Sequence, residues 1–264
     1  MSNLGPGSVP TKLEVAGVSK SFGGVQAVSE VSLEIPEGTI YSIIGPNGAG
    51  KTTLLNMVSG FYHPDHGTIR LDGGDITRLT PANRAALGIA RTFQNIALFS
   101  GLSVLENLML GRHVHMRSGV FASLIYWGWA QREEVEHRRR VEEIIDFLKL
   151  TDLRRQPTGA LAYGLRKRVE LGRALAVDPT LLLLDEPMAG MNQEEKEDMV
   201  RYVLDVNNEM GTTIVLIEHD MGVVMDISDQ VAVLDQGRKI AEGTADEVRA
   251  DSKVIEAYLG STHH

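Results

Sequence analysis

The chain of 264 residues is 43% hydrophobic and 23% charged, an ordinary composition for a globular protein. Its formal net charge of −9 argues against a nucleic-acid-binding protein, because such proteins usually carry a basic surface. The sequence has no cysteine, which excludes a disulfide framework, a cysteine zinc site and an iron–sulfur cluster. No stretch reaches the about 20 apolar residues that a membrane span requires.

The N-terminal part of the chain divides into a leader and two strands. Residues 1–10 are rich in Gly, Pro and Ser, carry no charged side chain and lack the apolar core of a signal peptide, so we expect a flexible leader. Residues 13–19 and 28–35 alternate enough between apolar and polar side chains to predict two strands of an antiparallel sheet. We expect residues 11–264 to form a single domain.

A phosphate-binding loop follows. Residues 45–52 read Gly-Pro-Asn-Gly-Ala-Gly-Lys-Thr and fit the P-loop pattern G-x-x-x-x-G-K-[ST] at every fixed position. A strand-like apolar run at 39–44 precedes the loop, and residues 53–58 continue it as a helix. Glycines let the backbone N–H groups face inward, and the helix start adds partial positive charge. The residues that we expect to bind phosphate or Mg²⁺ are Asn47, Gly48, Ala49, Gly50, Lys51, Thr52 and Thr53.

The middle of the chain predicts an inserted helical region. A strand at 88–93 ends at Gln94, whose neutral side chain can contact Mg²⁺ or an attacking water. Strand–helix alternation typical of a parallel α/β core runs from 39 to 93 and resumes near Pro179, whereas 95–177 is helical in pattern. A helix predicted at 132–150 carries an apolar stripe, made of Val135, Val141, Ile144, Ile145 and Leu148.

Both tryptophans lie at 118–129, a segment too short to span a bilayer. Two interpretations stay open for it. The segment packs on the helical region, or it forms an apolar patch that meets a partner or a membrane surface.

An amphipathic helix is predicted to open at residues 161–165, which read Leu-Ala-Tyr-Gly-Leu. The N-terminus of such a helix can face an anion. Its apolar side carries Val169, Leu171, Ala174 and Leu175.

The leucine run at 181–184 predicts a buried parallel strand. It ends in Asp185 and Glu186, at the strand end where open α/β sheets hold ligands. Asp185 can hold Mg²⁺, because this hard cation prefers oxygen ligands. Glu186 can orient or deprotonate an attacking water. Together with the P-loop, this pair indicates a nucleoside triphosphate hydrolase.

Two further signals lie near the C-terminus. A β-branched strand at 213–217 is followed by Glu218 and His219, and an imidazole at a strand end can sense the γ-phosphate. A capping box from Thr244 to Glu247 predicts the start of a helix.

The order and spacing of these motifs resemble the ATP-binding-cassette (ABC) ATPases over nearly the whole chain. Residues 45–52 look like the Walker A loop, and 181–186 look like the Walker B strand. Gln94 matches the Q-loop glutamine and His219 matches the switch histidine. Residues 161–165 occupy the signature position, usually L-S-G-G-Q.

Two more positions extend the resemblance, because residues 188–192 occupy the D-loop and Phe22 lies where the family has an aromatic that stacks on adenine. The resemblance implies an α/β fold, with a P-loop NTPase core, an antiparallel β subdomain and an inserted helical subdomain at about 95–177. It also implies ATP and Mg²⁺ as ligands, with Mg²⁺ held by Thr52, Gln94 and Asp185.

In this family one chain holds half of each active site. The resemblance implies that the signature helix, with Ala162 and Gly164, caps the γ-phosphate of ATP on a second ABC ATPase subunit, in a homo- or heterodimer. Glu186, His219 and Gln94 would carry the catalysis.

A narrower resemblance comes from short motifs at 189–192, 218–221 and 257–260, and from an insertion after residue 112. These are similar to the larger ATP-binding subunit of branched-chain amino acid importers. Such a subunit would couple ATP hydrolysis to transmembrane permease subunits and indirectly to a substrate-binding protein, from a peripheral position on the cytoplasmic face of the inner membrane.

Other functions stay open at this point. The closest alternatives are the ATPase of a urea or amide importer and that of a lipid or lipopolysaccharide exporter. A soluble non-transport ABC ATPase and a regulatory nucleotide-binding module without turnover are further alternatives. The presence of Glu186 and His219 argues against the regulatory module.

The signature departs from L-S-G-G-Q at three of its five positions. Ala162 lacks the hydroxyl of serine, and Leu165 lacks the polar group of glutamine. Backbone N–H groups and the helix dipole remain, so we expect phosphate binding to survive with a weaker contact.

An apolar run at 95–99 follows Gln94 directly and is predicted to hold a short helix of the permease. In the alternative interpretation, Leu98 and Phe99 fill the core of the helical subdomain.

Overall fold

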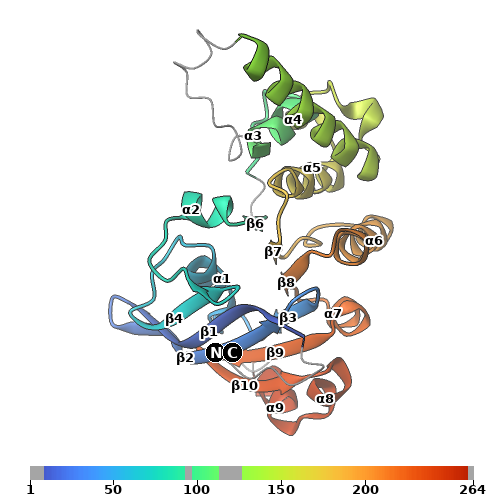
Figure 1. Cartoon of the computed structure of the whole chain (residues 1–264). Coiled ribbons are helices and arrows are strands. Elements are labelled where there is room, and N and C mark those ends of the chain that lie inside the picture. Colours follow the sequence, from blue (N-terminus) through green and yellow to red (C-terminus); the bar gives the residue numbers. More distant parts are fainter. Residues whose placement is uncertain (1–8, 93–96, 113–126, 261–264) are drawn as a thin grey trace.

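The computed structural model describes residues 9–92, 97–112 and 127–260, apart from the side chains of 127–134 and 259–260 (Figure 1). Gln94 lies outside the described residues, as does most of the leader at 1–10. The apolar segment at 118–129 lies outside them too, except for the helical backbone of its last residues. The predictions made for these parts therefore stay predictions.

Two sheets form the lower part of the molecule in Figure 1. The first is antiparallel, with the strand order β2-β1-β4-β5. Its strands are β1 (Thr11–Phe22), β2 (Val25–Pro36), β4 (His66–Leu71) and β5 (Gly74–Asp75). The two strands predicted at 13–19 and 28–35 are confirmed, and both extend further in each direction.

One prediction for this region is wrong. Residues 39–93 do not belong wholly to the parallel core, because β4 and β5 join the antiparallel sheet. Strand β4 pairs with β1 in a register that places Ile69 opposite Val15. Both side chains are buried in the same apolar cluster, and this shared burial fixes β4 beside β1.

The second sheet has six strands in the order β10-β9-β3-β8-β7-β6. Neighbouring strands in this sheet run parallel to each other, except β9 and β10, which are antiparallel. Strands β3, β7 and β8 are buried at every position, as expected for a parallel sheet covered on both faces. The strands are β3 (Ile40–Ile44), β6 (Ile89–Arg91), β7 (Leu181–Asp185), β8 (Thr213–Ile217), β9 (Gln230–Asp235) and β10 (Arg238–Gly243).

Helices connect and cover these strands. The α-helices are α1 (Lys51–Val58), α2 (Pro81–Ala86), α3 (Val104–Arg112), α4 (Trp127–Phe147), α5 (Tyr163–Leu175), α6 (Gln193–Met210), α7 (Met221–Ile227), α8 (Ala245–Ala250) and α9 (Ser252–Gly260). Two 3₁₀ turns, η3 (Thr151–Leu153) and η4 (Thr158–Ala160), lie before α5.

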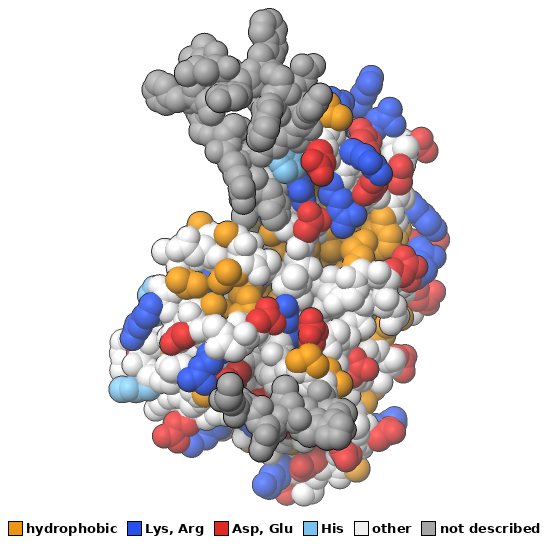
Figure 2. All heavy atoms as spheres, viewed as in Figure 1, with side chains coloured by type: hydrophobic (Ala, Val, Ile, Leu, Met, Phe, Trp, Pro, Cys, Tyr) orange, Lys and Arg blue, Asp and Glu red, His pale blue; other side chains and the backbone are white. Residues whose placement is uncertain are grey.

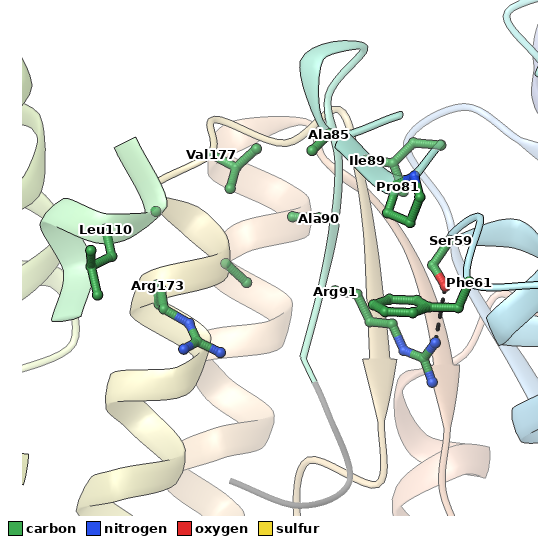
Figure 3. Close-up of a pocket in the computed structure, with 12 residues that line it drawn as sticks. Ser59, Phe61, Pro81, Ala85, Ile89, Ala90, Arg91, Leu110, Arg173 and Val177 are labelled. Atoms are coloured by element: carbon green, nitrogen blue, oxygen red, sulfur yellow. Dashed lines mark hydrogen bonds between the residues drawn. The ribbon is translucent and has the colours of Figure 1, made fainter. Parts of the chain in front are cut away.

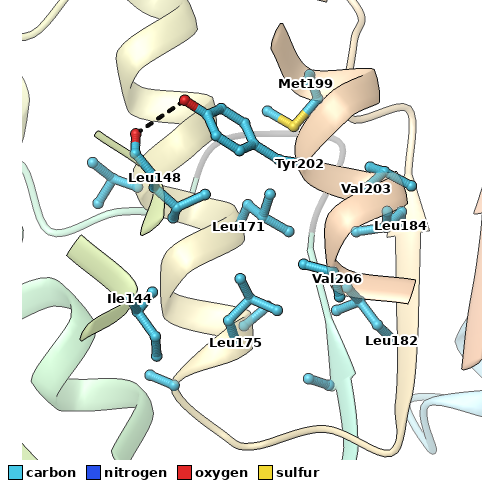
Figure 4. Packing of buried hydrophobic residues seen from close by; sticks show 14 of the residues in the cluster. Ile144, Leu148, Leu171, Leu175, Leu182, Leu184, Met199, Tyr202, Val203 and Val206 are labelled. Atoms are coloured by element: carbon cyan, nitrogen blue, oxygen red, sulfur yellow. Dashed lines mark hydrogen bonds between the residues drawn. The ribbon is translucent and has the colours of Figure 1, made fainter. Parts of the chain in front are cut away.

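Strand β7 separates the two main cores, because successive side chains on a strand point to opposite faces. Leu181 and Leu183 pack in a cluster with α1 and the antiparallel sheet. Leu182 and Leu184 pack in a second cluster, with apolar side chains of α5 and α6 such as Leu171 (Figure 4). The second cluster therefore fastens the helical subdomain to the far face of the parallel sheet.

Helices α3, α4 and α5 form the helical subdomain, which stands above the sheets in Figure 1. The subdomain is inserted in the chain between β6 and β7, which are neighbours in the sheet, so the chain leaves and returns at the same edge. The predicted apolar side of α5 is confirmed, since its four apolar residues are buried: Val169, Leu171, Ala174 and Leu175.

The stripe predicted for α4 is correct except at Val135, which is 63% exposed. An α-helix turns by about 100° per residue, so Val135 lies roughly 120° away from Val141 around the axis. The position in phase with Val141 is His137, which is buried. The stripe thus continues through a histidine, and hydrophobicity alone pointed to the wrong residue.

The C-terminal region closes one end of the six-stranded sheet. Helix α8 begins with the predicted capping box, in which Thr244 and Glu247 each bond the backbone of the other. Val248 and Val254 of α8 and α9 pack on Val231 and Val233 of β9. Within the described ranges, no helix is both long and apolar enough to cross a membrane.

Candidate nucleotide-binding site

The P-loop connects β3, the strand between β8 and β9, to the first turn of α1. Gly50 is the N-cap of α1 with φ +97°, so the helix starts at Lys51 and its first N–H groups face the loop. A cavity of about 250 Å³ lies here, lined by Ala27, by residues 47–53, by Glu186 and by His219. The structure thus brings together all seven phosphate-binding residues predicted from the P-loop pattern.

Two glycines of the loop are required by their surroundings. A Cβ at Gly45 would collide with the carbonyl oxygen of Leu234, and a Cβ at Gly50 would collide with that of Ala27. Both glycines also have positive φ, which L side chains rarely adopt. Glycine at these two positions therefore lets the backbone of the loop pass close to β2 and β9.

Lys51 lies inside the cradle. Its Nζ donates to the carbonyl oxygens of Gly45 at 2.7 Å and of Pro46 at 2.9 Å. Burial lowers the pKa of Lys51, while the carboxylates of Glu186 and Asp185 act in the opposite direction. An ammonium held by two neutral carbonyls in a part-buried site is well placed to exchange them for phosphate oxygens, which are charged acceptors.

Asp185 ends β7 and is buried at the level of the P-loop. Its Oδ2 accepts a hydrogen bond from Arg91 Nη2 at 2.8 Å, and its Oδ1 is buried without a hydrogen-bond partner in the part of the chain that the structure describes. Burial raises the pKa of Asp185, and Arg91 opposes this shift. A buried carboxylate oxygen that has no hydrogen-bond donor beside it is a suitable ligand for an Mg²⁺ ion or for one of its waters.

Mg²⁺ keeps several waters and binds phosphates, so it needs only one or two protein ligands. Asp185 and the hydroxyl of Thr52 fit that requirement, and Thr52 lies on the cavity wall. Within the described ranges, no group of three or more His, Cys, Asp and Glu side chains is placed to hold a metal by itself. The donor set therefore suits Mg²⁺ brought in with a nucleotide.

Glu186 and His219 meet at the rim of the cavity. His219 Nε2 lies 2.7 Å from Glu186 Oε1, and a carboxylate can only accept, so the proton of this bond is on Nε2. Glu186 has φ +51°, a strained value for a residue with a side chain, and its N–H donates to Ile217 O at 2.9 Å. This bond to the end of β8 holds the strained backbone and aims the carboxylate at the cavity.

Glu218 is a functional residue that the sequence interpretation passed over. It is buried, and it accepts hydrogen bonds from the backbone N–H of Met188 at 2.8 Å and of His219 at 3.1 Å. Burial raises the pKa of Glu218. Its carboxylate thus connects the segment after Glu186 to the segment that carries His219. This connection fixes the distance between the side chains of Glu186 and His219.

The predicted signature helix begins as expected. Ala162 is the exposed N-cap of α5 and provides no side-chain hydrogen bond, so the first turn relies on backbone N–H groups alone. Gly164 is buried against the carboxylate of Glu195, which closes the capping box of α6, and a Cβ there would collide with it. Leu165 is partly buried against the subdomain core, which accounts for an apolar residue in place of glutamine.

Phe22 ends β1 and is 41% exposed, outside the buried apolar clusters. An exposed ring cannot be a core residue of the antiparallel sheet, which would be the alternative role for an aromatic at the end of β1. The ring makes an edge contact with Tyr62, with 5.0 Å between centroids, and Lys20 Nζ lies 5.6 Å from its centre. Phe22 does not line the phosphate cavity itself.

Known proteins that are similar to this chain are described as ATP-binding. A family model described as ABC transporter matches residues 28–189. The chain belongs to the ABC transporter family. A second model, described as Branched-chain amino acid ATP-binding cassette transporter, matches residues 238–264 of this ABC ATPase.

Two curated relatives of this ABC ATPase have similar names. The chain is 41% identical to the high-affinity branched-chain amino acid transport ATP-binding protein BraF of Pseudomonas aeruginosa, over 94% of this chain and 97% of the relative. It is 40% identical, with the same coverage, to the high-affinity branched-chain amino acid transport ATP-binding protein LivG of Escherichia coli.

Solved structures confirm the fold class of the ABC ATPase. A nucleotide-free ATP-binding cassette from an ABC transporter superposes with a TM-score of 0.82 and 36% identity, over 94% of this chain and 98% of that one. A dimeric cassette in a post-hydrolysis state, bound to ADP and Pi, gives a TM-score of 0.75 and 26% identity, over 88% and 98%. The P-loop NTPase core with its antiparallel and helical subdomains is thus shared with nucleotide-binding cassettes.

Proposed function

We propose that this chain is the ATP-hydrolysing, energy-coupling subunit of an importer for branched-chain amino acids. The hydrolytic part rests on one observation, the Glu186–His219 pair at the rim of the P-loop cavity. The substrate class is supported by the names of the relatives and by the family model that matches the C-terminal residues.

The residues divide the chemistry between them. Lys51 and the N–H groups of the P-loop bind the β- and γ-phosphates, and Phe22 contacts the adenine from the end of β1. Asp185, Thr52 and Gln94 would hold Mg²⁺, which supplies charge neutralisation on the phosphates. Glu186 accepts a proton from the attacking water or orients it, while His219 keeps the carboxylate turned toward the phosphate.

The signature helix supports a site shared between two subunits. The N-terminus of α5 carries N–H groups without a side-chain cap, as an anion-binding helix end requires. Ala162 and Gly164 at this end would contact the γ-phosphate on a second ABC ATPase subunit. A solved relative described as dimeric and bound to ADP and Pi supports this arrangement.

A groove between the helical subdomain and the α/β core would receive the permease. A cavity of about 340 Å³ lies there, with Phe61, Ala90, Leu110 and Val177 among its lining residues (Figure 3). Apolar side chains also gather at this level on the face shown in Figure 2. Burying them against a helix of a membrane protein gains roughly 25 cal/mol per Å² of apolar area, less the cost of association. The chain would then sit peripherally on the cytoplasmic face of the inner membrane, and a substrate-binding protein would act on it indirectly.

Phe99 tests the docking from the predicted apolar run at 95–99, outside the lining of this cavity. It is 58% exposed, so it does not fill the subdomain core, whereas Leu98 is partly buried against that core. We expect Phe99→Asp to keep the fold and ATP binding but to lose coupling to the permease; Leu98→Asp should do the same at some cost in stability. The measurement is co-purification with the permease followed by transport in vesicles. A folded Phe99→Asp protein that binds the permease and transports at the wild-type rate would exclude the docking role.

The proposed function as a whole is tested by reconstitution. The chain, co-expressed with permease subunits, a second cassette and a substrate-binding protein of a branched-chain amino acid importer, should hydrolyse ATP faster when leucine is supplied outside the vesicle. Stimulation by urea instead of leucine would assign the alternative importer class.

A further inference from the structure

Arg91 ends β6, and its guanidinium joins the two segments that build the phosphate cavity. Nη2 donates to Asp185 Oδ2 at 2.8 Å, in an ion pair with almost no exposed surface. Nη1 donates to Asn56 Oδ1 at 2.6 Å and to Ser59 Oγ at 3.0 Å, at the far end of α1. One side chain therefore connects the strand that carries the metal-binding carboxylate to the helix that starts at the P-loop.

The same guanidinium also lies against the groove between the subdomains. Its Cζ is 5.9 Å from the centre of the Phe61 ring, and Figure 3 shows the two side chains together on one wall of the 340 Å³ cavity. Phe61 is 52% exposed. A helix that enters the groove would touch Phe61, and Phe61 touches the residue that holds Asp185.

The hydrogen bond from Arg91 makes the two oxygens of Asp185 unequal. Oδ2 is occupied, whereas Oδ1 is buried and, within the described ranges, accepts no hydrogen bond. A carboxylate fixed at one oxygen keeps the direction of the other, which is how partners behind a metal ligand orient it. Oδ1 is then the atom that would accept Mg²⁺ or one of its waters.

We propose that Arg91 is a positioning residue that orients Asp185 for the metal. Through the same side chain, a helix bound in the groove would change the position of Asp185 in the metal site. The second half of this proposal rests on the proposed docking of a permease, and the first half does not. Arginine suits the role, because its planar fork serves Asp185 through one nitrogen and Asn56 through the other. A lysine ammonium is a single point charge and cannot keep both geometries.

The first test uses the full chain without the permease. The affinity for adenylyl imidodiphosphate is measured by calorimetry, once with MgCl₂ and once with EDTA, for the wild type, Arg91→Lys and Arg91→Gln. We define the Mg²⁺ gain as the ratio of nucleotide affinity in MgCl₂ to that in EDTA. We expect this gain to be about 10- to 100-fold smaller in both variants than in the wild type, the usual effect of removing a partner of a metal ligand. Their affinity in EDTA should stay close to that of the wild type.

The matched control is Arg70→Gln, which removes an arginine paired with Glu14 at 3.1 Å in the antiparallel sheet. It should keep the full gain from Mg²⁺. A merely structural Arg91 would lower the affinity equally in EDTA and in MgCl₂, together with the melting temperature. Either that result or an unchanged Mg²⁺ gain in Arg91→Lys overturns the proposal, and Arg91→Lys decides if Arg91→Gln does not fold.

The second test uses the assembled transporter. Phe61→Leu removes the ring from Arg91 and keeps an apolar side chain in the groove. The ratio of substrate-stimulated to unstimulated ATP turnover is measured for Phe61→Leu, Arg91→Lys and the double variant. Because the two residues act in series, we expect the double variant to lose no more stimulation than the more damaging single variant.

Losses that add in the double variant would show that Phe61 and Arg91 act independently, and they would overturn the link from groove to metal. A wild-type chain that fails to co-purify with the permease would instead remove the proposed function. The Mg²⁺ measurement on the free chain would still decide whether Arg91 orients Asp185, so the two failures are distinguishable.

Discussion

The two halves of the nucleotide site on this chain are built differently. The cradle half lies at the ends of β3, β8 and β7, consecutive strands of one sheet. Hydrogen bonds hold its side chains: Lys51 to backbone carbonyls of the loop, Asp185 to Arg91, and Glu186 to His219. The signature half is a single helix end with no side-chain cap at Ala162. The described cradle residues are held by contacts within one chain, whereas the exposed N-cap of α5 leaves its first N–H groups to water or to a bound anion.

The difference follows from where each half is anchored. Strand ends in a buried parallel sheet are fixed by hydrogen bonds on both sides. Helix α5 is held by apolar contacts of Leu171 and Leu175 in the cluster it shares with Leu182 and Leu184 (Figure 4). Side-chain contacts rather than a hydrogen-bonded ladder therefore hold the signature helix, including the ion pair of Arg168 with Asp198 and the contact of Lys167 Nζ with the backbone oxygen of Glu186 at 3.5 Å.

The largest expected effect is on the cradle itself. We expect Lys51→Ala to abolish productive ATP binding, because the ammonium offsets the charge of the β- and γ-phosphates. Nucleotide titration of the purified variant measures this, with the exposed Lys253→Ala as the control. Unchanged ATP affinity and turnover in Lys51→Ala would mean that the cradle is not the binding half.

The next largest effect is expected on the rate of ATP hydrolysis, through the catalytic residues of the cradle. Glu186→Gln should keep ATP binding and lower turnover by roughly 10²–10⁴, the usual contribution of a positioned base. It should also trap an ATP-bound dimer that elutes earlier in size-exclusion chromatography, which requires the signature half of a second copy. His219→Ala should lower turnover as well. Wild-type turnover in Glu186→Gln, measured beside the exposed control Glu209→Gln, contradicts the assigned role.

Phe22 tests how far the cradle half extends. A ring stacked on adenine contributes on the order of 1–3 kcal/mol by analogy with base–aromatic stacking. Phe22→Ala should then weaken ATP binding by roughly five- to a hundred-fold. Because the ring is exposed, thermal melting should change little. A large loss of melting temperature with unchanged affinity would assign Phe22 to structure instead.

The smallest expected effect concerns the signature half. Ala162→Ser places a hydroxyl at the N-cap of α5, where φ −57° and ψ 157° already suit a capping serine. We expect about 1 kcal/mol of added stability, or an increase of about 2–4 °C in Tm for a chain of this size. Differential scanning calorimetry compares it with Ala160→Ser, an exposed position before the cap. Equal changes in melting temperature in both variants would mean that the backbone N–H groups at the start of α5 already have hydrogen-bond partners.

The parts of the site that sequence could predict are those encoded within a few residues. The P-loop is contiguous, and Asp185 follows four leucines directly, so a local pattern was sufficient. Arg91 was missed because its partner Asp185 lies 94 positions away, and no local pattern marks such a pair. Glu218 was read only as a neighbour of His219, although its burial against Met188 gives it a role of its own.

The fold shows the same division. Local apolar patterns predicted the positions of β1, β2, β3, β6, β7 and β8. They did not say which sheet a segment joins, so the residues of β4 were placed in the parallel core with the rest of 39–93. Helix α4 was predicted, but its buried face was wrong at Val135, because an apolar residue was preferred to the helical phase that selects His137.

The leucine run of β7 has a consequence for how this strand finds its alignment. A slip of one residue normally moves apolar side chains to the wrong face of a strand. With leucine at 181, 182, 183 and 184, such a slip leaves leucines filling both faces over most of the strand. The run therefore does little to select its own register. Asp185 does discriminate between alignments, because a slipped strand would draw its carboxylate away from the guanidinium of Arg91 and break this buried ion pair.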